Sequence, residues 1–130
     1  MKNLVWLASY PKSGNTWIRA CLMLAITGEL SLDSLIGIIP YFPVLNNVYF
    51  KDTKFSDPIE ASRAAVKMWD KTQTDISSLN NVRQMIVKTH QIFGNINNVQ
   101  FPNLDCALGV IQLVRDPRDV ALSYAAHYGR

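Results

Sequence analysis

The chain has 130 residues, of which 48% are hydrophobic and 18% are charged. These proportions are typical of a globular protein and exclude a disordered one, and the length fits one domain or part of one. The net charge of +3 is mild and the basic residues are scattered, so the sequence gives no reason to expect nucleic-acid binding.

The first predicted elements are a strand at about residues 3–9, a turn, and a helix at about residues 15–27 that ends near Gly28. The turn carries a glycine, a lysine and hydroxyl groups. A strand, such a turn and a helix form a phosphate cradle, because backbone N–H groups and the positive end of the helix dipole point at the anion. The candidate anion-binding residues are Lys12, Ser13, Gly14, Asn15, Thr16 and Trp17.

The order of residues in this turn differs from that of nucleotide-hydrolysing P-loops, which read G-x-x-x-x-G-K-[ST]. With Gly14 on the second glycine, Thr16 takes the metal-binding hydroxyl position, but Asn15 takes the lysine position. The only lysine of the turn, Lys12, lies upstream. The hypothesis of an ATPase or GTPase therefore loses most of its support, and a P-loop kinase of a small metabolite stays an alternative.

Residues 29–58 are rich in proline, asparagine and aromatic side chains, which indicates a loop with a short helix at about 32–38. A helix at about 59–70 and a short helical or turn segment at about 75–79 follow. Two roles stay open for the loop aromatics, namely an acceptor pocket or core packing. These aromatics are Tyr41, Phe42, Tyr49 and Phe55.

A second strand is predicted at 84–89, with Lys88 and His90 at its tip. Residues 91–105 look irregular. Residues 108–114 are rich in β-branched side chains, as expected of a buried parallel strand. A helix starts at 117, with Asp116 as its N-cap and a proline in its first turn.

Strands that alternate with helices predict an α/β fold with a P-loop-like parallel sheet and helices on both faces. Ligands of such sheets bind beyond the carboxyl ends of the strands. The three strands end at Ser9, His90 and Arg115. We therefore expect these three tips to meet at one edge of the sheet.

Three motifs resemble those of the cytosolic type of sulfotransferases, which take a sulfuryl group from 3′-phosphoadenosine 5′-phosphosulfate (PAPS). They are the loop Tyr-Pro-Lys-Ser-Gly-x-Thr-Trp at 10–17, the Lys-Thr-His tip at 88–90, and the strand-turn-helix segment at 110–124. The family loop usually has threonine where this chain has Asn15. The resemblance implies that the loop binds the 5′-phosphosulfate, that Trp17 stacks on the adenine, and that Arg115 and Ser123 hold the 3′-phosphate.

The resemblance also implies catalytic roles. His90 would be the general base for an acceptor hydroxyl or amine, Lys88 would stabilise the sulfuryl group, and Lys12 would neutralise charge on the leaving phosphate oxygen. No metal is expected, because lysines supply the cation. Taken alone, a histidine such as His90 is more often a structural residue than a catalyst, and its place beside Lys88 and two anion-binding motifs favours the catalytic role.

The resembled family continues with a Gly- and Lys-rich segment that also binds the 3′-phosphate, so we expect residues 1–130 to form a partial sulfotransferase domain with uncovered apolar surface. A truncated nucleotide-binding module without catalysis is therefore an alternative. Two unpatterned cysteines and no signal-peptide or membrane-spanning pattern predict a cytoplasmic protein. The small-molecule acceptor and the oligomeric state are left open.

Overall fold

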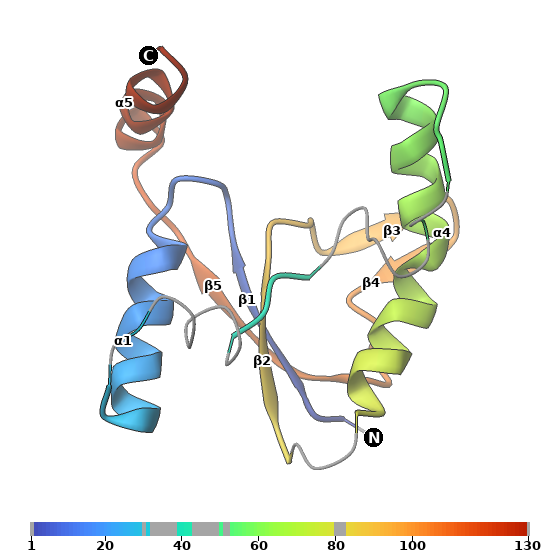
Figure 1. Ribbon diagram of the computed structural model, residues 1–130, viewed down its shortest axis with the longest axis horizontal. Helices are drawn as coiled ribbons and strands as arrows, with labels where there is room; N and C mark the ends of the chain where they lie inside the picture. The colour runs from blue at the N-terminus through green and yellow to red at the C-terminus, as the bar shows by residue number, and fades with distance from the viewer. Residues whose placement is uncertain are drawn as a thin grey trace.

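A three-stranded parallel sheet forms the centre of the molecule (Figure 1). The computed structural model describes residues 2–29, 31, 39–42, 50, 53–79 and 83–129, so the helix expected at 32–38 and Tyr49 lie outside the described residues. The predicted α/β class with a parallel sheet is confirmed. The strands, in spatial order, are β2 (Met85–Thr89), β1 (Leu4–Ser9) and β5 (Ala107–Leu113).

Helices lie on both sides of this sheet, as expected. Helix α1 (Asn15–Thr27) and helix α4 (Pro58–Ser77) lie on opposite sides, and α5 (Pro117–Tyr128) extends past the end of the sheet where β5 leaves it (Figure 1). Gly28 ends α1 in the left-handed conformation, with φ of 76°, which glycine adopts without steric cost. Within the described part of the chain, no helix has the length and apolar character needed to cross a bilayer.

The expected break between a helix at 59–70 and a segment at 75–79 is wrong, because α4 is continuous through it. Trp69 and Gln73 both lie on the buried side of this helix, and Gln73 is fully buried. The Gln73 Oε1 atom accepts a hydrogen bond from the backbone N–H of Asn103 at 2.7 Å, so its polar group is satisfied inside the fold.

The expectation of irregular structure at 91–105 is also wrong. Strands β3 (Gly94–Ile96) and β4 (Val99–Phe101) pair as an antiparallel hairpin. The two residues between them, Asn97 and Asn98, have φ of 53° and 64°. Asparagine tolerates this left-handed conformation, which two-residue hairpin turns require.

The main core lies between the sheet and α4. Aromatic rings dominate it: the Trp6 ring is 4.9 Å from that of Phe101 and 5.1 Å from that of Phe42, measured between centroids. Edge-to-face geometry adds to the apolar burial of such rings. Phe42 is therefore a core residue, which settles its role. The buried cluster consists of Leu4, Trp6, Phe42, Trp69, Val87, Phe101 and Cys106.

Strand β5 is not buried as predicted. It pairs with β1 on one side only, at the end of the described three-stranded sheet. Its apolar side chains stay accessible, with Val110 47% exposed and Val114, just after the strand, 83% exposed. A β-branched run thus predicted the strand correctly but not its place at the edge. The expected uncovered apolar surface is confirmed along this edge.

Candidate functional site

The three strand tips meet at one edge of the sheet, as predicted. In the parallel register, Ala8 pairs with Thr89 and Ser9 pairs with Leu113, so the segments that follow each strand leave side by side. A cavity of about 370 Å³ opens there. It is lined by Pro11, Lys12, Gly14, Asn15, Thr16, Trp17, Lys88, His90, Arg115 and Ser123. Every site residue expected from the sequence, except Ser13, lines this cavity.

The loop between β1 and α1 presents backbone donors that the hydrogen bonds of the helix leave unused. Gly14 caps α1 with φ of 94°, and no side chain caps the first turn of the helix. The first hydrogen bond of the helix runs from the N–H of Ile18 to the carbonyl of Gly14, at 3.2 Å. The preceding N–H groups, those of Asn15, Thr16 and Trp17, therefore have no partner within the helix. Such donors at the positive end of a helix dipole form an anion site.

The side chains of this loop point in different directions, which the sequence did not predict. Asn15 is 5% exposed, and its Nδ2 donates inward to the Leu7 carbonyl and the Ser9 hydroxyl, so its backbone N–H is its group for an anion. Trp17 is 78% exposed, so it is not a core residue and its indole is accessible for stacking. Ser13 lines a separate cavity, which Arg115 also lines.

The position and charge state of His90 fit a general base. Its Nδ1 lies 2.7 Å from the backbone carbonyl oxygen of Ser9. Because a carbonyl only accepts, we assign the ring hydrogen to Nδ1, which leaves the lone pair of the neutral ring on Nε2. Burial lowers the pKa of His90 and the charge of Lys88 lowers it further, whereas the bond to Ser9 raises it. The ring is therefore neutral near pH 7.

Residues 39–42, which lie in the predicted loop, hold Lys88 beside His90. The Lys88 N–H donates to the Pro40 carbonyl at 2.8 Å, and the Phe42 N–H donates to the Lys88 carbonyl at 2.7 Å. This pairing places the Tyr41 ring 4.7 Å below the Lys88 ammonium and 5.9 Å from the His90 ring, measured to its centroid. Burial, followed by the charge of Arg19, lowers the pKa of Lys88. Sequence reasoning left the role of Tyr41 open, and the structure puts it at the site.

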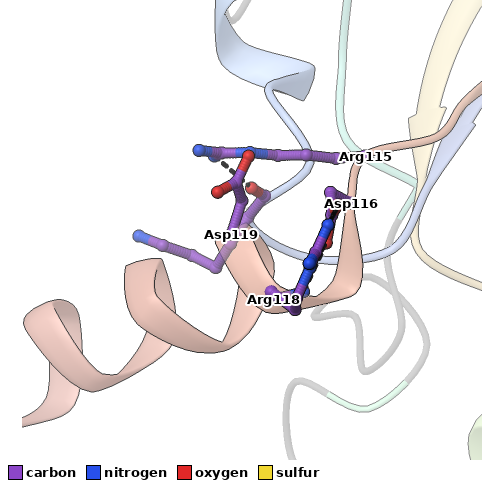
Figure 2. Close-up of polar contacts among 5 residues, drawn as sticks. Arg115, Asp116, Arg118 and Asp119 are labelled. Carbon is purple, nitrogen blue, oxygen red and sulfur yellow. Dashed lines mark hydrogen bonds and ion pairs between the residues drawn. The ribbon is translucent and has the colours of Figure 1, made fainter.

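Arg115 bridges the phosphate loop and the start of α5. Its Nη1 donates to the Lys12 carbonyl at 3.1 Å, and its Nε lies 3.7 Å from the Asp119 carboxylate (Figure 2). Arg118 pairs instead with Asp116, whose carboxylate also accepts the Arg118 N–H and caps α5 as predicted. Arg115 is thus oriented from both ends, and its remaining N–H groups are not used by these contacts.

A family model described as "Sulfotransferase domain" matches residues 2–130. The chain belongs to the sulfotransferase domain family. No curated protein matches the chain with significance. The family match confirms the resemblance drawn from the three motifs, and it indicates sulfuryl transfer as the general activity of this domain.

Three other features of the sulfotransferase domain concern possible metal ligands, a second cavity and the cysteines. Among the described residues, no three His, Cys, Asp or Glu side chains gather as metal ligands would. The cavity that Ser13 lines has a volume of about 460 Å³ and runs along β5 and α5. Cys21 and Cys106 are both free thiols, the first exposed and the second buried.

Proposed function

We propose that this sulfotransferase domain moves a sulfuryl group from PAPS to a hydroxyl or amine of a small acceptor. One observation carries the proposal: a single cavity brings together a phosphate cradle, an arginine fork and a lysine–histidine pair. Those are the groups needed to hold two phosphates and to take a proton from a nucleophile.

The donor would be held from two sides of the cavity. The free N–H groups at the start of α1 and the Lys12 ammonium suit the 5′-phosphosulfate. Arg115 and Ser123 suit the 3′-phosphate, since a guanidinium offers paired donors to a phosphate. The exposed Trp17 ring suits stacking on the adenine. When bound, PAPS supplies the activated sulfuryl group.

The acceptor proton would go to the Nε2 atom of His90. The Ser9 carbonyl fixes the ring so that this nitrogen carries the lone pair, and burial keeps the ring neutral at physiological pH. The ammonium groups of Lys88 and Lys12 line the same cavity and would stabilise the negative charge that develops on the sulfuryl and leaving oxygens. These cations take the part that a metal plays in phosphoryl transfer.

A cytoplasmic location is part of the same proposal. Cys21 is an exposed free thiol, which persists in a reducing compartment such as the cytoplasm.

Binding and transfer can be tested separately. Titration calorimetry with adenosine 3′,5′-bisphosphate should show binding that weakens in Lys12→Ala and stays unchanged in Lys67→Ala, a control lysine on α4, on the other side of the sheet. Incubation with sulfur-35-labelled PAPS and a panel of phenols, alcohols and amines should give a labelled product. Binding without any product would support a nucleotide-binding module instead. Preferential, Mg²⁺-dependent binding of ATP would contradict the proposed donor.

A further inference from the structure

We propose that Asn15 is a positioning residue, which acts through Ser9 to hold His90 in the tautomer that a base requires. This role rests on the proposed function, in which His90 takes the acceptor proton. It differs from a direct contact between the Asn15 side chain and the donor.

The contacts form a chain from the phosphate loop to the base. The Asn15 Nδ2 donates to the Ser9 Oγ at 3.0 Å and to the Leu7 carbonyl at 3.3 Å. Both acceptors belong to the last three residues of β1. The amide of Asn15 therefore ties the first residue of α1 to the C-terminal end of β1.

The clamped tip is the partner of the base. The Ser9 carbonyl accepts the Nδ1–H of His90 at 2.7 Å, and the Ser9 Oγ lies 3.3 Å from the same nitrogen. In a neutral histidine, the hydrogen bond made by one ring nitrogen decides which nitrogen carries the hydrogen. If the tip of β1 moves, the hydrogen bond between Nδ1–H and the Ser9 carbonyl weakens. Part of the population then carries the hydrogen on Nε2.

The burial of Asn15 supports a role inside the fold. Its side chain is buried at the start of an otherwise exposed helical turn, and its Oδ1 has no hydrogen-bond partner among the described residues. Burying an amide costs free energy, and the two bonds that its Nδ2 makes are the contacts that offset this cost.

A substitution at Asn15 removes none of the charged and titratable side chains around His90. Their side chains come from β2, the 39–42 segment, the phosphate loop, α1 and the start of α5. They are Lys88, Tyr41, Lys12 and Arg115, together with Arg19, whose charge acts on Lys88. A change in the tautomer of His90 can therefore be assigned to the Asn15–Ser9 contact and not to a lost charge.

Nitrogen-15 NMR of the imidazole rings reads the tautomer directly and without any turnover. The chain has two histidines, so a His127→Gln variant assigns the signals. The wild-type chain should show His90 with its hydrogen on Nδ1. Asn15→Ala should lower the ratio of the Nδ1–H to the Nε2–H form by about two- to tenfold, the equivalent of one net hydrogen bond. Asn15→Leu, which keeps the buried volume, should do the same and serves if the alanine variant does not fold.

Thr16→Ala is the matched control, because Thr16 is the next residue of the same helical turn and its side chain is exposed. It should leave the His90 tautomer as in the wild type. A wild-type His90 with its hydrogen on Nε2, or a wild-type tautomer ratio in both Asn15 variants, would overturn the positioning role.

Sulfation kinetics give a second reading. The bond to Ser9 raises the pKa of His90, so its loss should move the acidic limb of the pH–rate profile to lower pH while kcat falls. A changed tautomer in a chain with no sulfation activity would count against the proposed function alone. An unchanged tautomer in an active chain would count against the positioning role alone.

Discussion

Replacement of Arg115 should separate recognition of the 3′-phosphate from recognition of the 5′-phosphate. Arg115 already donates to the Lys12 carbonyl and lies beside Asp119, so its other N–H groups are the ones left for a ligand (Figure 2). A charged hydrogen bond is worth about 1.5–3 kcal/mol, and the side chain is 41% exposed, which favours the lower half of that range. We expect Arg115→Ala to cost about 2 kcal/mol, or about 30-fold in Kd.

Two ligands and one control variant make this result specific. Titration calorimetry should show the loss for adenosine 3′,5′-bisphosphate but little change for adenosine 5′-monophosphate, which lacks the 3′-phosphate. Arg118→Ala is the control, because Arg118 lies in the same turn and its guanidinium pairs with Asp116 (Figure 2). It should leave both affinities unchanged. The reasoning is refuted if Arg115→Ala weakens both ligands equally or neither of them.

Three further predictions concern stability and charge. Burial lowers the pKa of Lys88, so the wild type gains stability as the pH rises from the pKa of Lys88 in the folded state to the ordinary pKa of lysine. Lys88→Met should abolish that gain, raise Tm at pH 7 and remove turnover. A lower Tm in this variant would contradict the prediction. Phe101→Ala should cost about 3–5 kcal/mol in urea unfolding, against about 0.5 kcal/mol or less for the exposed Phe93→Ala, and equal losses would argue against the core as described. Asp57→Ala removes the cap of α4 and should cost about 1 kcal/mol, whereas an unchanged urea midpoint would show that the cap contributes nothing.

The sequence predicted the arrangement of the site better than its details. Parallel strands with loops at their carboxyl ends bring the tips together whatever the side chains are, so the meeting of Ser9, His90 and Arg115 followed from the order of the elements. The cap at Asp116 followed from local chemistry. Both depend on short-range rules that a single sequence displays.

The errors arose where tertiary context decides. The inward orientation of the Asn15 side chain depends on hydrogen-bond acceptors at Leu7 and Ser9, which no local pattern reveals. The exposure of β5 depends on which strands pair with it, and the continuity of α4 depends on a partner for Gln73 that lies 30 residues away. The hairpin at 94–101 did have a local signal, the Asn-Asn pair between two short segments in which polar and apolar residues alternate.

The central claim is that His90 takes a proton from the acceptor while the other residues of the cavity hold the donor. Single-turnover transfer from sulfur-35-labelled PAPS, measured beside the Kd of adenosine 3′,5′-bisphosphate, tests it most directly in wild type and His90→Ala. We predict that the variant keeps its donor affinity and loses about 10²- to 10⁴-fold in the rate of transfer, the usual contribution of a general base. Transfer at the wild-type rate in His90→Ala would contradict the claim.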